Sequence, residues 1–250
     1  MVNPETTHCD PADENLIIEE TRIKRNVLED MKEMGRGERP EPQEDWDLIW
    51  VLSGPPIDIA EDFKGGNTDV IFEPGDGSAK KDIARGINES RERLETGMRI
   101  SKEVAARRLN KGVQYLTTED VENFCPPVYW NATDWANNNL RERIGQGFLR
   151  KFEFPSNKVI VSSNLGIKHT GHQFEKMENG VVDGKRKVVI ITDTYHLPRI
   201  KRYLNMDDCT VKKEDVILFP SEPRRVPIAK ALGEIKKVPK YIKNSVLPKE

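Results

Sequence analysis

The chain has 250 residues, of which 36% are apolar and 33% are charged, and its formal net charge is −2. This near-neutral balance gives no global attraction to nucleic acid or to an anionic membrane surface. The sequence contains no run of about 18 apolar residues, so we expect a soluble protein without a membrane-spanning helix. The polar start, MVNPETTHCDPADEN, lacks the basic and apolar segments of a secretory signal, which favours a cytoplasmic location.

The first 44 residues are predicted to form an acidic helical arm and a linker. Asp10 and Pro11 are typical of a helix start, with Asp10 as the cap and Pro11 in the first turn. Apolar residues then recur at helical spacing as far as Gly35, which is typical of a helix end. The stretch GRGERPEPQED is rich in turn residues and predicts a linker.

Five short apolar runs are spaced along residues 45–222 and predict strands. They are DLIWVL (47–52), PPVYWN (126–131), KVIVSS (158–163), KVVIIT (187–192) and DVILFP (215–220). The runs are continuously apolar and do not alternate with polar residues, as expected for strands covered on both faces. The pattern therefore predicts a parallel sheet with helices on each side.

Helical patterns separate most of these runs. A long amphipathic helix is predicted from Ile83 to Leu109, after an irregular loop at residues 55–80. Thr133 or Asp134 is expected to cap a second helix, whose apolar stripe extends to Phe152. Shorter helices are expected at 170–178 and 198–204, with a turn at 178–186 between them. The fold class that follows is α/β, a Rossmann-like doubly wound sheet of about five strands with an extra N-terminal helix.

The last segment, residues 223–250, is predicted to be a basic, proline-containing tail. From Ser221 onward the chain has 8 basic and 3 acidic residues, whereas residues 1–45 have 13 acidic and 6 basic ones. Two arrangements remain open from this charge pattern: the tail packs against the acidic arm, or it is solvated.

Polar residues are concentrated where the predicted strands end. In open parallel sheets, ligands bind beyond the carboxyl ends of the strands, near the point where the strand order reverses. These ends carry Ser53, Gly54, Asn131, Thr133, Asp134, Ser162, Ser163, Asn164, His169, Thr170, His172, Thr192, Asp193, Thr194, Tyr195, His196 and Arg199. Three of the four histidines lie in this set, which makes this edge the candidate site.

The segment KVVIITDTYHLPRIKRYL, residues 187–204, carries the densest chemistry. His196 would lie at the start of a helix, where the helix dipole disfavours imidazolium and keeps the ring able to exchange a proton. Arg199 follows three residues later on the same face, and a guanidinium fork suits a phosphate or carboxylate. The pair predicts an anion clamp with an acid–base group beside it. The structural alternative is that Thr192 and His196 cap the helix while Arg199 pairs with a surface acid.

Other site chemistries have weaker signals. The Ser53–Gly54 turn fits a close approach to phosphate, but dinucleotide and P-loop fingerprints are absent, and the sequence identifies no cofactor. His169 and His172 have a spacing that suits a metal on a helix, without a third ligand fixed by spacing. A nucleophilic serine is disfavoured because no G-x-S-x-G motif is present. Cys9, Cys125 and Cys209 are odd in number and far apart, so we expect ordinary reduced thiols and no metal site.

Four segments, in this order, resemble the ElyC/SanA/YdcF-like family, also described as domain of unknown function 218 (DUF218). They are DLIWVLSG, RLETGMRISKEV, KVIVSSNLGIKHTGHQF and VVIITDTYHLPRIKRYL, within residues 46–222. The resemblance implies a Rossmann-like sheet with a pocket lined by Arg93, Thr170, Thr192, His196 and Arg199. Where the family carries an acidic residue and an asparagine, this chain has His172 and Gln173. The family is linked to bacterial envelope biogenesis, and one branch looks able to bind S-adenosylmethionine.

Two functional hypotheses use the same residues. In the first, the protein is an enzyme acting on a phosphorylated or nucleotide-like small molecule. Arg93 and Arg199 hold the anion, Ser53, Gly54 and Thr192 donate hydrogen bonds, and His196 is the acid or base. In the second, the protein is a non-catalytic module that binds a nucleotide or S-adenosylmethionine. A third possibility is an interaction protein that self-associates through its charged ends, and the sequence does not define an oligomeric state.

Overall fold

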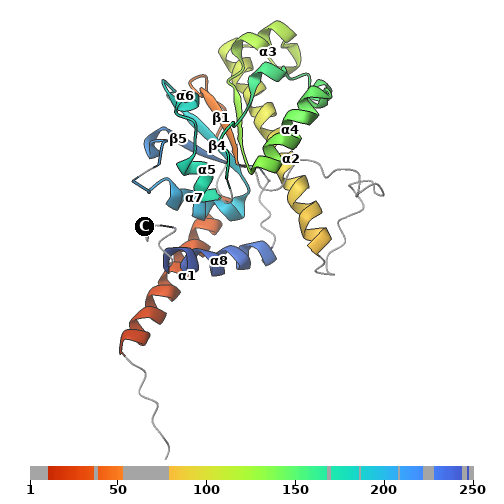
Figure 1. Ribbon diagram of the computed structural model, residues 1–250. Coiled ribbons are helices and arrows are strands. Elements are labelled where there is room, and N and C mark those ends of the chain that lie inside the picture. The colour runs from red at the N-terminus through yellow and green to blue at the C-terminus, as the bar shows by residue number, and fades with distance from the viewer. Residues whose placement is uncertain are drawn as a thin grey trace, which may run out of the picture.

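The computed structural model describes residues 11–36, 39–52, 79–167, 170–185, 187–207, 209–221, 228–243 and 247. Its centre is a parallel sheet with the order β3-β2-β1-β4-β5 (Figure 1). The strands are β1 (Leu48–Leu52), β2 (Val128–Asn131), β3 (Val159–Val161), β4 (Val188–Thr192) and β5 (Val216–Pro220). The predicted α/β class and the five parallel strands are confirmed.

The strand order reverses beside β1. From β1 the chain adds β2 and β3 on one side, and then crosses to add β4 and β5 on the other. The register pairs Leu48 with Val188 and Val51 with Ile191, so β1 and β4 end level with each other. This is the topological switch point, and ligands of open α/β sheets bind at the carboxyl ends there.

Helices cover both faces of the sheet. The longer ones are α1 (Pro11–Arg36), α2 (Ala79–Arg108), α4 (Asp134–Gly145) and α8 (Ile228–Lys243). The shorter ones are α3 (Thr118–Phe124), α5 (Thr170–Glu175), α6 (Asn179–Val182) and α7 (Leu197–Tyr203). Ile49 and Val51 of β1 belong to the core cluster that contains α2, α3 and α4. Trp50 belongs to the other cluster, with residues of α1, α5, α7 and α8. Burial on both faces explains why the strands lack polar alternation.

The C-terminal segment forms a helix that packs on the N-terminal one. Residues 228–243 form α8, where the sequence predicted only a basic tail. Helix α8 lies across α1 (Figure 1), and its Val238 is fully buried in one cluster with Ile23 and Val27 of α1. Of the two arrangements left open by the charge pattern, the structure has the packed one. Pro239 lies inside this helix, and a proline is normally evidence against a helix interior.

Three other local predictions differ from the structure. The helix expected to reach Phe152 ends at Gly145, and Gly147, with φ +86°, takes the left-handed conformation that separates it from a 3₁₀ turn at 148–152. Residues 179–182, expected in a turn, form the short helix α6. Residues 118–124 form α3, which was not predicted from the sequence, and Thr117 caps this helix. The Asp10 cap and residues 55–78 of the predicted loop lie outside the described residues, and the last two residues of that loop, 79 and 80, belong to α2.

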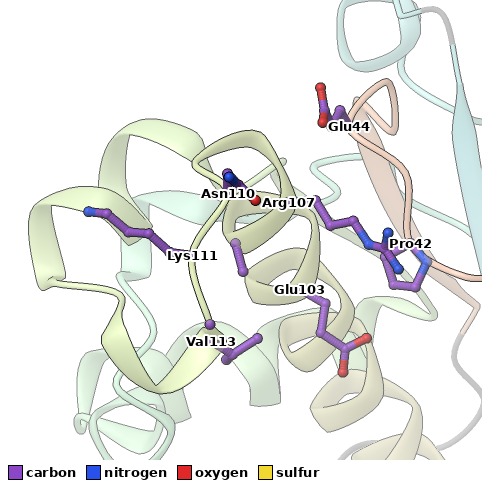
Figure 2. A pocket seen from close by; sticks show the side chains of 9 residues that line it. Pro42, Glu44, Glu103, Arg107, Asn110, Lys111 and Val113 are labelled. Atoms are coloured by element: carbon purple, nitrogen blue, oxygen red, sulfur yellow. The ribbon is translucent and has the colours of Figure 1, made fainter.

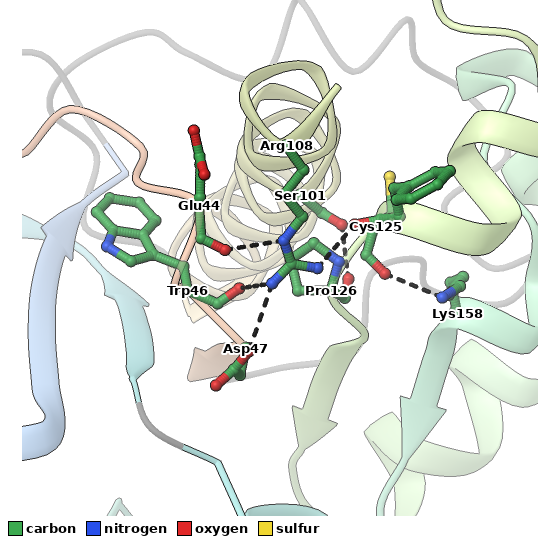
Figure 3. A network of polar contacts seen from close by, with 9 residues as sticks. Glu44, Trp46, Asp47, Ser101, Arg108, Cys125, Pro126 and Lys158 are labelled. Atoms are coloured by element: carbon green, nitrogen blue, oxygen red, sulfur yellow. Dashed lines mark hydrogen bonds and ion pairs between the residues drawn. The ribbon is translucent and has the colours of Figure 1, made fainter. Parts of the chain in front are cut away.

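The amino edge of the sheet is held by Arg108, at the end of α2 (Figure 3). Its guanidinium donates hydrogen bonds to the carbonyl oxygens of Glu44 (2.8 Å), Trp46 (2.9 Å) and Phe124 (2.9 Å). A cation at a helix C-terminus also interacts favourably with the helix dipole. This network fixes the chain just before β1 and just before β2, and leaves the opposite edge for the candidate site.

Candidate functional site

A buried ion pair joins the carboxyl ends of β1 and β4. Arg93 of α2 donates from Nη1 to the carbonyl oxygen of Leu52 at 2.9 Å, and its Nη2 pairs with a carboxylate oxygen of Asp193. Ser221, which follows β5, donates its hydroxyl to Asp193 Oδ1 at 2.5 Å. The side chains of Arg93 and Asp193 are 4% and 1% exposed. Three strand ends are therefore tied together through one carboxylate.

The environment of Asp193 favours its ionised form. Burial by itself would raise the pKa of this carboxyl group. The charge of Arg93 and the hydrogen bonds from Arg93, Ser221 and Tyr195 act in the opposite direction and prevail, so the pKa is lowered from its ordinary value of 3.8. Arg93 was predicted to bind a ligand anion. In the structure its guanidinium faces an anion of the protein itself.

A second buried cluster lies at the start of α7. His196 is the residue that caps this helix, and Arg199 lies in its first turn, as predicted. Both face Glu234 of α8, whose side chain is only 2% exposed. Glu234 Oε1 lies 3.3 Å from Arg199 Nη2 and 3.7 Å from His196 Nε2. Lys237 Nζ lies 3.9 Å from the same oxygen. His196 and Arg199 are therefore brought together, but Arg199 pairs with an acid of the protein itself, as in the structural alternative, and this acid is buried rather than at the surface.

The imidazole of His196 is kept neutral, but mainly for a reason other than the one the sequence suggested. Its pKa lies well below the ordinary value of 6.5, first because the ring is buried, and then because the cations of Arg199, Arg93 and Lys237 repel a further positive charge. The side chain is 21% exposed, so one edge of the ring is accessible. A neutral imidazole can accept a hydrogen bond or a proton at one ring nitrogen and donate a hydrogen bond from the other, although its lowered pKa makes it a weaker base than an ordinary histidine.

This pKa shift predicts a loss of stability at mildly acidic pH. In the unfolded chain His196 binds a proton as the pH falls below about 6.5, whereas in the folded protein it does not until a lower pH. The free energy of unfolding should therefore decrease between pH 7 and pH 5, by up to about 1.4 kcal/mol per pH unit from this group. Asp193 affects the free energy of unfolding in a different pH range, because the stability that it contributes is lost only as the pH falls below its unfolded pKa of 3.8.

Urea unfolding followed by circular dichroism between pH 5 and pH 7.5 measures this effect. His196→Asn should flatten the dependence on pH, and His172→Gln, which removes an imidazole from α5, serves as the matched control. If the free energy of unfolding of His196→Asn depends on pH as steeply as that of the wild-type protein, protonation of His196 is not the cause of the loss of stability at acidic pH.

Thr192 contributes a second unusual feature at this edge. Its side chain is fully buried, and its hydroxyl oxygen forms no hydrogen bond with any described residue. Along β4, Thr192 has the same parity as Val188 and Ile190, whose side chains belong to the cluster containing α7 and α8. The hydroxyl therefore lies on the sheet face that carries His196 and Arg199.

Polar residues after β2 and β3 are engaged in connecting loops. Asn131 Nδ2 donates to the carbonyl oxygen of Gln173 at 2.9 Å, and Gln173 donates back to the carbonyl of Asn131. Glu178 Oε1 accepts hydrogen bonds from the hydroxyl groups of Ser162 (3.2 Å) and Ser163 (2.8 Å). Thr133 caps α4, and Asp134 accepts a hydrogen bond from the backbone of Gly166. These contacts close the loops on this side of the sheet.

The remaining predicted site residues are placed as follows. Thr170 is the first residue of α5 and is half-buried. Ser53, Gly54 and His169 lie outside the described residues. Over the described ranges, no group of three or more His, Cys, Asp or Glu side chains could hold a metal ion. Cys125 and Cys209 form no disulfide bond within the described ranges.

Three residues of the clusters were absent from the predicted set: Ser221, Glu234 and Lys237. Each follows the last predicted strand and comes close to the site only through the fold. Glu234 is the only acidic residue between Glu222 and Glu250, within a strongly basic segment. That isolation is the one sequence signal that could have marked it.

A separate cavity of about 480 Å³ lies beside the C-terminal end of α2, near Arg107, Lys111 and Glu44 (Figure 2). Its basic residues are paired with acids, Arg107 with Glu41 at 3.0 Å and Lys111 with Asp120 at 3.0 Å. The cavity is on the side of the sheet away from the strands' carboxyl ends, and its charges are mixed and exposed. We therefore do not consider this cavity a candidate ligand-binding site.

These features define an α/β protein of the Rossmann-like doubly wound class, with two buried charge clusters at its switch point. Comparison with known proteins does not narrow this class, because no family model, no curated protein and no solved structure matches the chain. Within the ranges that the structure describes, none of the helices combines the length and the apolar character needed to cross a bilayer.

Proposed function

We propose that the protein binds a phosphorylated or nucleotide-like small molecule at the carboxyl edge of the sheet, with Arg199 and His196 contacting its anionic group. One observation carries the proposal: these two side chains already surround a buried carboxylate, that of Glu234, next to the switch point. A guanidinium fork binds phosphate and carboxylate oxygens in the same geometry. The buried hydroxyl of Thr192 on the same face offers a further hydrogen bond.

Arg93 takes a supporting role in this proposal. Its contacts with Asp193 and with the carbonyl of Leu52 fix the ends of β1 and β4, and its charge acts on His196 from a distance. Direct binding of ligand by Arg93, Thr170, Ser53 and Gly54 stays a prediction, as does the relationship to the ElyC/SanA/YdcF-like family. A role in envelope metabolism and a cytoplasmic location belong to the same prediction.

The role of His196 distinguishes an enzyme from a binding module. A neutral, partly exposed imidazole beside a bound phosphate suits acid–base catalysis of hydrolysis or group transfer, which contributes about 10²–10⁴-fold to a rate. The alternative is a non-catalytic module for a nucleotide or S-adenosylmethionine. In an enzyme, His196→Asn would retain binding and lose turnover by that factor. In a module, the wild-type protein would bind without turnover.

A thermal-shift screen tests the binding proposal. The probes are inorganic phosphate, a nucleoside monophosphate, a sugar phosphate and S-adenosylmethionine. A probe present at about 100 times its Kd should add about 2.7 kcal/mol of stability. We expect Arg199→Ala to lose this stabilisation. Arg107→Ala, which removes an exposed arginine from α2, is the matched control and should keep it.

Two outcomes would overturn the proposal. In the first, no phosphorylated or nucleotide-like probe stabilises the wild-type protein or the Glu234→Gln variant. In the second, a probe binds, and Arg199→Ala binds it as tightly as the wild-type protein does.

A further inference from the structure

The geometry points to α8 as an internal competitor for the ligand: the Glu234 carboxylate occupies the position of the ligand's anionic group, and binding displaces the helix. This inference rests on the proposed function and extends it to the regulation of the same site. It starts from the position of Glu234, which is a nearly fully buried acid on a helix with a basic exposed face.

Burial of Glu234 is not explained by the packing of α8 alone. Taking a carboxylate out of water costs several kcal/mol, and a well-packed apolar residue often stabilises a protein as much as a buried ion pair does. The neighbouring Val238 of the same helix shows that apolar burial is available on this face. The carboxylate instead matches Arg199, His196 and Lys237, at 3.3, 3.7 and 3.9 Å. The Glu234 carboxylate therefore takes the place that the anionic group of a ligand would take beside Arg199 and His196.

Helix α8 also covers Arg199 from a second direction. The guanidinium carbon of Arg199 lies 5.8 Å from the centre of the Tyr241 ring, a cation–π contact from the same helix. Glu234 and Tyr241 together surround the group that is proposed to bind the anion. When α8 is docked, a phosphate cannot take the place of the Glu234 carboxylate beside Arg199. Binding then requires the helix to leave.

The composition of α8 favours such a release. Gly233 and Pro239 lie within its 16 residues, and in a helix interior they are less favourable than alanine by about 1 and about 3 kcal/mol. Isolated helices shorter than about 12–15 residues are marginal even with good helix formers, and the 16 residues of α8 are only slightly more and include a glycine and a proline. Helix α8 therefore depends on its contacts with α1 and with the turn that contains His196. Elements of low local stability are the ones that open without global unfolding.

The vacated site also limits the class of ligand. Arg93 faces Asp193, and Lys237 moves with α8, so Arg199 and His196 remain. One guanidinium and one neutral imidazole suit a single anionic group, such as a phosphate monoester. A diphosphate gripped by two arginines would need Arg93 to leave its buried carboxylate.

Binding of inorganic phosphate to the full chain, measured by calorimetry, tests the inference. A state populated at about 1–10% weakens apparent binding by about ten- to a hundredfold, and removal of the competitor recovers that factor. We therefore expect Glu234→Gln to bind phosphate at least about tenfold more tightly than the wild-type protein. Glu122→Gln, at an exposed position on α3, is the matched control and should bind as the wild-type protein does.

Hydrogen exchange on the wild-type chain gives a readout that does not depend on any variant. Saturating phosphate should speed amide exchange in residues 228–243 and leave β4 unchanged. The inference is overturned if phosphate binds through Arg199 while exchange in α8 is unchanged or slower, or if Glu234→Gln gains no affinity. Absence of binding in both proteins would instead overturn the proposed function, and this inference with it.

Discussion

Replacement of Asp193 by alanine is expected to lower the free energy of unfolding by about 3–5 kcal/mol, which is the usual cost of removing one member of a buried ion pair. The variant removes the carboxylate that faces Arg93 and that accepts the hydroxyl of Ser221. Both charged side chains are almost fully buried, so water cannot take over the role of the carboxylate. Equilibrium unfolding in urea, followed by far-UV circular dichroism, measures the loss.

A double variant separates the ion pair from the loss of packing. Arg93→Met with Asp193→Leu replaces both charges by apolar groups of similar size. Because buried ion pairs seldom exceed apolar contacts in stability, the double variant should recover much of the loss seen in Asp193→Ala. If the double variant is instead less stable than Asp193→Ala, then the ion pair itself contributes net stability beyond that of apolar contacts.

The strands and their parallel pairing could be predicted because their signal is local, whereas the strand order could not. Each strand is a short run of apolar residues, such as Leu48–Leu52, and the intervening helical stripes imply parallel pairing. The rule that ligands bind at the carboxyl ends then placed the candidate site without any distance being known. His196 at the start of α7, with Arg199 in its first turn, follows from the same local pattern.

The partners of these residues could not be predicted, because they come from distant segments. Asp193 pairs with Arg93, and Arg199 with Glu234, through packing that no short window of sequence contains. Proline and glycine within 228–243 argue against a helix on local propensity, and tertiary contacts with α1 override that preference. The sequence therefore predicted an open pair of basic side chains, whereas in the structure Arg199 faces a carboxylate of the protein itself.

Helix α5 is anchored mainly by one aromatic side chain. Phe174 is 2% exposed, and its ring centre lies 4.8 Å from that of Trp50 and 5.4 Å from that of Tyr203. A helix of six residues cannot be stable by itself, so α5 is held by this contact and by the hydrogen bonds of Gln173 with Asn131. Aromatic contacts of this kind add about 0.5–1.5 kcal/mol to the burial of apolar area.

Phe174→Ala should therefore destabilise the protein by about 3–5 kcal/mol, as measured by urea unfolding. Phe124→Ala is the matched control, because this ring is 39% exposed on α3 and its loss should cost only about 1–2 kcal/mol. Phe174→Leu keeps most of the apolar volume and should fall between the two. If Phe174→Ala is no more destabilising than Phe124→Ala, α5 is not anchored by the aromatic cluster. In that case Thr170, at the start of α5, would owe its position to the loop hydrogen bonds alone.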